Sequence, residues 1–306
     1  FRGAVVFHNP GAGTGPTPLA WVRRQLEVAG IDAEVYSVPA APGKKVPLRL
    51  APDLVIIIGG NGTVRHALLR LPDHSAPVLL IPTGTANNIA RSLGVSELPK
   101  AINLLDRVSM LPFDLGTVEW KGDSHYFLES AGAGILARMM HLMQLRKANH
   151  PDAQQYQAEK YQDAVYLMWE IARAQSAFPY RLLLDGQDYS GDYLFVEVMN
   201  ISLMGPGLRL APAADPGDGL LDVTLLRPEA RPQFERYLEG RLQGRPAPPT
   251  FETHRCRTVE LEWTAPDVHI DGETFKEYED PMMHLSVLPN DLRFLAPMGA
   301  GRDGRR

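Results

Sequence analysis

The sequence predicts a doubly wound α/β domain followed by a second, mostly antiparallel β domain. Strand-like and helix-like stretches alternate over the first third of the chain, as they do where helices join parallel strands. After about Asp114 the pattern changes to short strands separated by turn residues. The 306 residues are enough for two domains, and 44% hydrophobic with 22% charged residues is ordinary for a globular protein with its own core.

The first domain is expected to contain buried strands and amphipathic helices. Residues Asp53–Ile58 are almost all apolar, as in a central parallel strand that is covered on both faces. In Pro18–Ala29 the apolar residues recur at helical spacing, and Gly30 follows as a stop. The remaining predicted elements are the strands Ala4–Phe7, Ala33–Val38 and Val78–Ile81 and the helices Thr63–Leu71 and Ala86–Leu93.

The second domain shows short alternating stretches with Asp-Gly or Gly-Asp turns between them, such as Asp185-Gly186. One long polar helix, Ala153–Ala177, is expected to interrupt the strands. The predicted strands are Tyr126–Leu128, Tyr180–Leu184, Tyr193–Met199, Leu221–Leu226, Thr258–Trp263 and Met283–Leu288.

Charge, cysteine content and hydropathy argue against several classes of protein. The net charge of −5 is unlike that of nucleic-acid-binding proteins, which usually carry a basic surplus. The single cysteine, Cys256, cannot form an intramolecular disulfide and fits a reducing compartment such as the cytoplasm. No apolar run approaches the roughly 20 residues of a membrane-spanning helix, so any contact with a membrane is expected to be peripheral.

Three glycine-containing loops follow predicted strands of the first domain: 9–15, 59–63 and 82–88. Glycine lets backbone N–H groups approach anionic oxygens closely, and a following helix N-terminus adds positive potential. One such loop would more often be an ordinary turn, but three on successive strands, with Thr and Asn neighbours, predict a phosphate site. None fits the Walker or the dinucleotide-binding pattern, so the site is of another kind.

The order of the motifs resembles the diacylglycerol kinase catalytic family, which includes bacterial lipid kinases, sphingosine kinases and ceramide kinases. The resemblance covers nearly the whole chain. The motifs that carry it are Asn9-Pro10, Gly59-Gly60-Asn61-Gly62-Thr63, Pro82-Thr83-Gly84-Thr85-Ala86-Asn87, Ala131-Gly132-Ala133-Gly134, Asn200, Gly205-Pro206-Gly207, Ala211-Pro212-Ala213, the stretch from Asp215 to Val223, and Ile270-Asp271-Gly272-Glu273.

The resemblance implies a Rossmann-like three-layer α/β domain of the NAD kinase and diacylglycerol kinase type, formed by residues 1–114 with the returning segment 289–306. It implies a β-sandwich over residues 115–288 for the lipid substrate, with ATP meeting that substrate between the domains. The implied reaction is ATP- and Mg²⁺-dependent phosphorylation of a hydroxyl of diacylglycerol or a related membrane lipid at the bilayer surface, in phospholipid biosynthesis. Exposed strand edges would also allow a homodimer.

The family pattern assigns roles to particular residues. Asp271 would be the base that orients or deprotonates the lipid hydroxyl, and Glu273 would help to place metal or nucleotide. The alternative for Asp271 is an ordinary hairpin turn. The carboxylates of Asp215 and Asp218 and the carbonyl of Leu220 would bind Mg²⁺ away from the transferred phosphate, the alternative being a solvated acidic turn. The residues expected to bind the nucleotide are Asn9, Gly11, Gly60, Asn61, Gly62, Thr63, Gly84, Thr85 and Asn87.

The sequence departs from the family at Asn61, where Asp is usual. Asn88 and His66 also replace residues that are often acidic, which lowers the negative charge expected around the nucleotide. Four explanations stay open: a working kinase with its metal held by Asp271, Glu273 and the nucleotide, a catalytically dead relative that binds nucleotide or lipid, a substitution introduced at Asn61, or partial deamidation of Asn61 to Asp.

Overall fold

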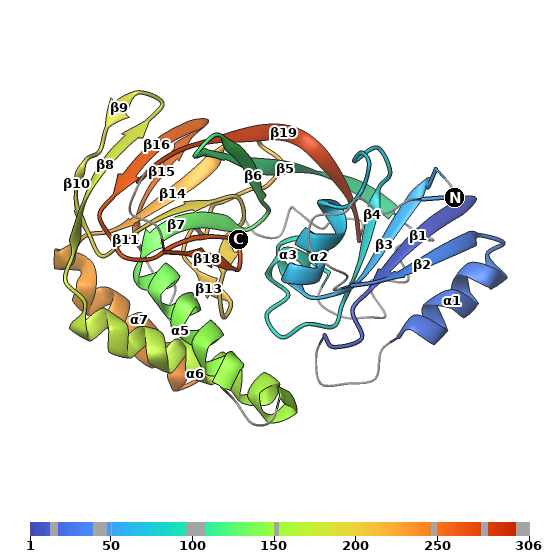
Figure 1. Cartoon of the computed structure of the whole chain (residues 1–306), viewed down its shortest axis with the longest axis horizontal. Coiled ribbons are helices and arrows are strands. Elements are labelled where there is room, and N and C mark those ends of the chain that lie inside the picture. The colour runs from blue at the N-terminus through green and yellow to red at the C-terminus, as the bar shows by residue number, and fades with distance from the viewer. Residues whose placement is uncertain are drawn as a thin grey trace. The chain divides into compact units, whose positions relative to one another are not determined.

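The computed structural model describes residues 1–12, 18–38, 48–49, 51–95, 108–149, 153–245, 250–276 and 281–297, with the side chains of 108, 153–160 and 297 left aside. The chain divides into two compact units. Unit 1 comprises Phe1–Phe113 and Asn290–Arg306, and unit 2 comprises Asp114–Pro289. Each unit contains both strands and helices (Figure 1).

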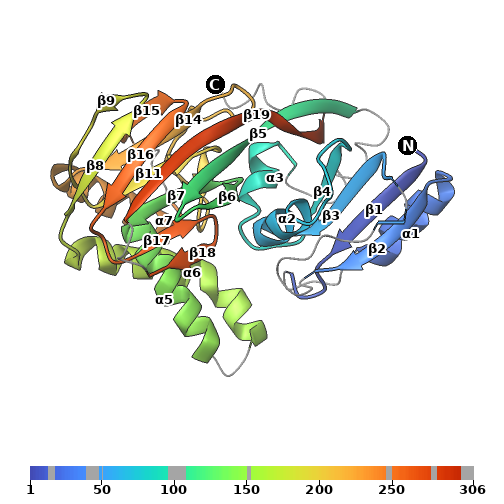
Figure 2. The same cartoon turned by 45° about the horizontal axis from the view of Figure 1, so that its top comes forward.

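Unit 1 is built on a parallel sheet in which the strands lie in the order β2, β1, β3 and β4 (Figure 2). The C-terminal strand β19 (Met282–Pro297) adds to this sheet, because Phe294 and Leu295 pair in parallel with β4. The four strands are β1 (Gly3–His8), β2 (Asp32–Ser37), β3 (Leu54–Gly59) and β4 (Val78–Pro82).

Alternation of strand and helix in unit 1 agrees with the predicted doubly wound layer. Every residue of β3 is buried, as expected for the apolar run in the centre of a parallel sheet. Helix α1 (Leu19–Val28) buries Val22 and Leu26, four residues apart on one face. Helices α2 (Asn61–Leu68) and α3 (Asn88–Ser92) follow β3 and β4 directly, so the loops before them lie at the same edge of the sheet.

Unit 2 contains a six-stranded antiparallel sheet in the order β15, β14, β11, β7, β17 and β18. A second antiparallel layer has the order β10, β8, β16 and β19. The hairpin of β5 (Val108–Trp120) and β6 (Asp123–Phe127) joins that layer through β19, and two short pairs complete the strands. The other bounds are β7 Ser130–Gly134, β8 Phe178–Leu184, β9 Gln187–Asp188, β10 Gly191–Tyr193, β11 Phe195–Met199, β12 Leu203–Met204, β13 Leu208–Arg209, β14 Leu221–Leu226, β15 Glu252–Cys256, β16 Thr258–Trp263, β17 Val268–Ile270 and β18 Glu273–Phe275.

The two layers of unit 2 share one apolar core, which makes the unit sandwich-like. Val196 and Val223 of one sheet and Leu182 and Leu261 of the other belong to the same buried cluster. On each strand, the residues that alternate with these core residues point to the other face of their sheet, because successive side chains of a strand alternate between faces. The predicted antiparallel β-sandwich is therefore confirmed.

Helices cover the second face of the six-stranded sheet, on one side of β7 and β11 (Figure 1). Phe195 of β11 packs there with Phe234 and Met168 of the helices. The sequence predicted one helix in this region, and the structure has α5 (Ile135–Asn149), α6 (Ala153–Ala174), η1 (Pro228–Ala230) and α7 (Arg231–Leu242). The four buried residues of α5 are nearly consecutive and do not follow helical spacing, while α7 buries only Phe234, Tyr237 and Leu238, which are too few to predict a helix.

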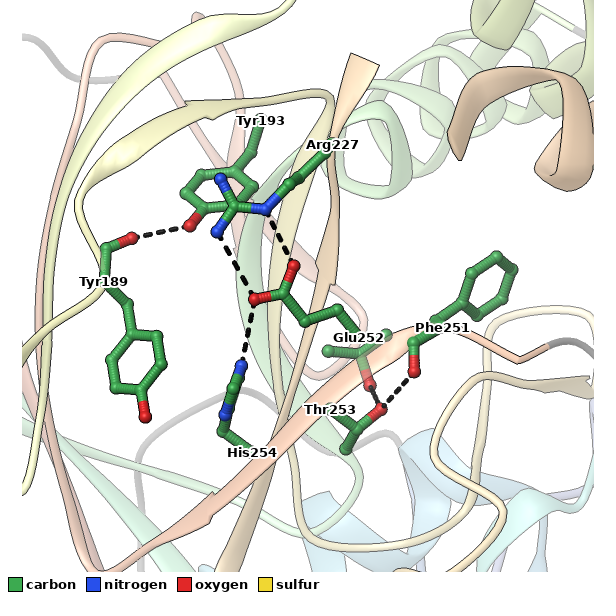
Figure 3. Close-up of polar contacts among 8 residues, drawn as sticks. Tyr189, Tyr193, Arg227, Phe251, Glu252, Thr253 and His254 are labelled. Carbon is green, nitrogen blue, oxygen red and sulfur yellow. Dashed lines mark hydrogen bonds and ion pairs between the residues drawn. The ribbon is translucent and has the colours of Figure 1, made fainter. Parts of the chain in front are cut away.

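A polar network in unit 2 links β15 with Arg227, which follows β14, and with Tyr193 of β10 (Figure 3). Arg227 donates to Glu252 at 2.7 and 3.3 Å, and its guanidinium lies 4.8 Å from the ring centre of Tyr193. His254 approaches the same carboxylate at 3.0 Å and contacts the Tyr189 ring. The Arg227 hydrogen bond lowers the pKa of Glu252. These partly exposed groups contribute modestly to stability.

Candidate active site

Two glycines bring the β3–α2 and β4–α3 loops of unit 1 into direct backbone contact. A Cβ atom at Gly84 would lie 2.6 Å from Cα of Gly60, and one at Gly60 would lie 3.1 Å from Cα of Gly84. Any side chain at Gly84 would therefore separate the loops. The pair leaves backbone without side-chain cover at the carboxyl edge of the sheet, where open α/β sheets bind ligands.

The loop after β1 is tied to the second loop by side chains. Asn9 donates from Nδ2 to Oγ1 of Thr63 at 3.1 Å, and its Oδ1 accepts the Gly11 N–H at 3.0 Å. Thr63 is only 4% exposed, and a Cβ at Gly59 would lie 2.3 Å from Thr63 Cβ. Of the predicted nucleotide-binding residues, Asn9 and Thr63 thus brace the loops against each other.

Two asparagines hold the second and third loops in place. Asn61, the first residue of α2, accepts the Ile89 N–H on Oδ1 at 3.3 Å. Asn87 has a left-handed backbone with φ of 47° and donates from Nδ2 to the carbonyl of Gly84 at 2.7 Å. Gly62 and Thr85 are exposed on these loops. An Asp at position 61 could accept the same N–H, so Asn61 preserves this link between helices.

Two further observations are consistent with binding of nucleotide phosphates by unit 1. Oγ1 of Thr83 is buried beside the glycine pair and has no hydrogen-bond partner among the described residues. A hydroxyl can donate to a phosphate oxygen, and helix α2 begins at the same edge with its N–H groups. The arrangement therefore offers donors to an anion from outside the protein.

Asp271 of unit 2 occupies the turn between β17 and β18, and its carboxylate is held by backbone N–H groups. It accepts from Leu128 at 3.1 and 3.2 Å, from Glu129 at 2.8 Å and from Ser130 at 3.3 Å. Its own N–H donates to the Ser130 carbonyl at 2.7 Å. These donors favour the ionised carboxylate.

The same turn is a hairpin, but it is more than the ordinary one considered from sequence. Asp271 has φ of 51° and is only 6% exposed, whereas the carboxylate of an ordinary hairpin Asp faces water. A left-handed non-glycine residue costs energy, and the hydrogen bonds of the carboxylate offset that cost. Gln144 of α5 also donates to the Gly272 carbonyl at 3.0 Å, while Glu273 is exposed at the start of β18.

Buried polar groups connect Asp271 to the loop 215–220. Asn200 donates from Nδ2 to the carbonyls of Leu128 and Asp114, at 3.1 and 2.9 Å. The fully buried Asp114 carboxylate accepts the Gly219 N–H at 2.7 Å. Asp114 was not predicted as a site residue, because an isolated Asp at the start of a strand-rich region carries no motif.

The loop 215–220 has its carboxylates engaged within the protein. Asp215 accepts the Gly217 N–H at 3.2 Å, and Asp218 accepts the Leu220 N–H at 3.0 Å and pairs with Arg255. Among the described residues, no three His, Cys, Asp or Glu side chains are grouped so that they could hold a metal ion. The metal role of Asp215, Asp218 and Leu220 stays a prediction.

Asp222, next to this loop, lies in the motif stretch from Asp215 to Val223, but the sequence assigned it no role. It is 2% exposed, and burial raises its pKa to about 6, with Asp218 and Asp215 adding to the effect and Arg255 opposing it. A carboxyl group of this kind carries its proton in mildly acidic solution, unlike an exposed Asp.

Comparison with known proteins identifies the family. Residues 3–118 match the diacylglycerol kinase catalytic domain, and residues 143–296 match the YegS C-terminal NAD kinase beta sandwich-like domain. A protein of Pseudomonas syringae pv. syringae named probable lipid kinase YegS-like is 31% identical over 254 residues, which cover 80% of this chain and 73% of the relative. The chain belongs to the diacylglycerol kinase family that includes the YegS-like lipid kinases.

Other relatives carry the same family names. The diacylglycerol kinase of Mycobacterium tuberculosis H37Rv is 28% identical over 251 residues, covering 80% of this chain and 77% of the relative. The crystal structure of a diacylglycerol kinase from Bacillus anthracis str. Sterne is similar in fold, with a TM-score of 0.68, 19% identity and coverage of 97% of both chains. As a member of this kinase family, the chain is a phosphotransferase. No helix in the described part combines the length and apolar character needed to cross a bilayer.

Proposed function

We propose that this member of the diacylglycerol kinase family transfers the γ-phosphoryl group of ATP to a hydroxyl of diacylglycerol or a related lipid. The observation that carries the proposal is the contact between Gly60 and Gly84, which leaves a backbone edge that only residues without side chains can form. The family membership supplies the reaction class. The geometry supplies donors for the phosphates.

In this proposal residues 1–114 with 289–306 bind the nucleotide, and residues 115–288 bind the lipid. The phosphates would lie against Gly60, Gly62, Gly84 and Thr85. Asn9, Thr63, Asn61 and Asn87 act mainly by holding the loops: Asn9 bonds to Thr63, Asn61 bonds to Ile89, and Asn87 bonds to Gly84 within its own loop. Phosphoryl transfer needs little covalent chemistry from the protein, so fixed loops are a large part of catalysis.

Asp271 would accept a hydrogen bond from the lipid hydroxyl and direct its oxygen toward the phosphorus. Its ionised carboxylate is ordered before substrate binds, because backbone N–H groups of 128–130 already fix its position. We propose that Mg²⁺ would be supplied with the nucleotide and that Glu273 would help to place the metal or the nucleotide. The loop of Asp215, Asp218 and Leu220 would hold a second ion only after Asp218 leaves Arg255.

The test is transfer of radiolabel from [γ-³²P]ATP to diacylglycerol in mixed micelles, with NAD and a sugar phosphate as soluble acceptors. Labelled lipid supports the proposal, and label in a soluble acceptor without lipid refutes it. The alternative is a nucleotide- or lipid-binding regulator, motivated by Asn61. That alternative predicts tight nucleotide binding and no transfer, even after Asn61→Asp. Peripheral membrane association and homodimerisation are further predictions, tested by vesicle co-sedimentation and light scattering.

A further inference from the structure

A histidine and a glutamate form a fully buried pair directly behind the Asp271 turn. Glu197 of β11 and His269 of β17 are both 0% exposed, and Nε2 of His269 lies 2.9 Å from Oε1 of Glu197. The two strands are not neighbours, because β7 lies between them. The sequence gives no sign of this pair, since the two residues are 72 positions apart.

A glycine on the intervening strand makes the contact possible. Gly132 of β7 is opposite Glu197 on one side and opposite His269 on the other. All three therefore lie on one face of the sheet, with the glycine in the middle. A Cβ at Gly132 would lie 2.5 Å from Oε2 of Glu197, so any larger residue would push the carboxylate away from the imidazole.

The hydrogen-bond partners of His269 fix where its protons are. Nδ1 lies 2.8 Å from the carbonyl oxygen of Asp271, and a carbonyl only accepts, so Nδ1 carries a proton. With Nδ1 protonated, Nε2 can bond to the Glu197 carboxylate only through a second proton between them. Burial lowers the pKa of His269, but the charge and hydrogen bond of Glu197 outweigh it, and the net shift is upward.

We propose that Glu197 and His269 are positioning residues for the Asp271 turn in phosphoryl transfer. His269 donates to the backbone carbonyl of Asp271 and so fixes the left-handed conformation that points the carboxylate at the N–H groups of 128–130. Glu197 fixes the ring orientation and the protonation of Nδ1. This inference rests on the proposed kinase function, since it assigns Asp271 to the acceptor hydroxyl.

Energetics favour a specific role for the pair over a purely stabilising one. Replacing a buried ion pair by apolar residues of similar volume is often neutral for stability or increases it, whereas removing one partner strands a buried charge. The double variant Glu197→Leu, His269→Leu is therefore expected to fold and to lack the hydrogen bond from His269 to the Asp271 carbonyl. Arg138, on the helix packed against β17, pairs with Asp267 and offers no replacement donor.

Steady-state kinetics of the double variant give the first readout. We expect kcat to fall about 10- to 100-fold, the loss typical of a catalytic group displaced by about 1 Å, while KM for ATP changes less than about threefold. Glu197→Gln should keep kcat near the wild-type value, because the Gln amide can donate to Nε2 of His269 and keep the proton on Nδ1. Val198→Ala, on the same strand with its side chain in the opposite core, is the matched control and should lower thermal stability without changing kcat.

Two readouts do not need catalysis. Amide hydrogen exchange at 128–130 should be at least about tenfold faster in the double variant than in Val198→Ala, because a released turn no longer holds these N–H groups. In the wild type, nitrogen-15 spectra should show both ring nitrogens of His269 protonated at neutral pH. These two measurements distinguish a failure of the inference from a failure of the proposed function, because both results are expected even if the wild type transfers no phosphate.

The inference is overturned by a folded double variant with unchanged kcat and unchanged exchange at 128–130, or by an unprotonated Nδ1 in the wild type. It is also overturned if Val198→Ala lowers kcat as much as the double variant. Should the double variant not fold, the nitrogen-15 spectrum and Glu197→Gln decide the matter: protonated Nδ1 with protected amides supports the positioning role.

Discussion

Replacing Gly84 by alanine places a methyl group where two loops of unit 1 touch. The new Cβ would lie 2.6 Å from Cα of Gly60 and 2.8 Å from Oδ1 of Asn87. The asparagine can rotate, but the backbone of Gly60 cannot. Ordinary van der Waals contact begins near 3.4 Å, so the loops must separate by roughly 0.8 Å.

That separation predicts a specific loss of nucleotide affinity. A displacement of about 1 Å in a preorganised site can cost about 100-fold, and overpacking of this kind destabilises a fold by about 1–3 kcal/mol. We therefore expect KM for ATP to rise about 10- to 100-fold in Gly84→Ala. The kinase remains folded at 25 °C, because unit 1 keeps its central strands.

The assay is nucleotide titration by calorimetry together with KM for ATP in the micelle assay. Gly3→Ala is the matched control, because a Cβ there meets nothing within 4 Å and Gly3 does not have a positive φ. It should bind ATP like the wild type. A Gly84→Ala protein that binds ATP with unchanged affinity refutes the assignment of these loops to the phosphates.

Four further predictions follow from single residues. Asp271→Asn should lower kcat at least about 100-fold with ATP affinity unchanged, since an amide cannot accept from all of its backbone donors, and kinetics with calorimetry check it. Asn61→Asp should keep the melting temperature within a few degrees, because a carboxylate also accepts the Ile89 N–H, and calorimetric scanning checks it. Asp222 has a pKa of about 6 in the folded protein against an ordinary 3.8, so between pH 4 and 6 it keeps a proton that the unfolded chain has lost. Its contribution to stability therefore falls as pH rises across that window. Asp222→Asn should be more stable than the wild type at pH 7.5 by up to roughly 3 kcal/mol, which denaturant titrations check. Cys256, buried with its pKa raised to about 12 by burial, should resist thiol reagents in the folded protein and react on unfolding.

Much of the architecture could be predicted because it depends on local patterns. The apolar run of β3 and the spacing of buried residues in α1 are properties of short segments. The strand β7 was not predicted, because its sequence Ser130–Gly134 is small and glycine-rich. Its glycines are explained only by neighbours: a Cβ at Gly134 would lie 2.3 Å from the Leu194 carbonyl oxygen.

The candidate site could be predicted in part for the same reason. Glycine loops and the Asp-Gly turn are contiguous in sequence, so their motifs are visible there. The roles of Asp114, Glu197 and His269 depend on partners from distant strands, and a single Asp, Glu or His has no distinguishing pattern. Thr63 shows the reverse case, since its motif suggested a phosphate ligand and the structure shows a hydroxyl bonded to Asn9.

The central claim is that this chain phosphorylates a lipid hydroxyl, and the most direct measurement is label transfer from [γ-³²P]ATP to diacylglycerol in mixed micelles. The wild type should form labelled phosphorylated lipid, and Asp271→Asn should form at most about one hundredth as much at equal ATP occupancy. A wild-type protein that binds ATP but labels neither diacylglycerol nor any related lipid would contradict the account.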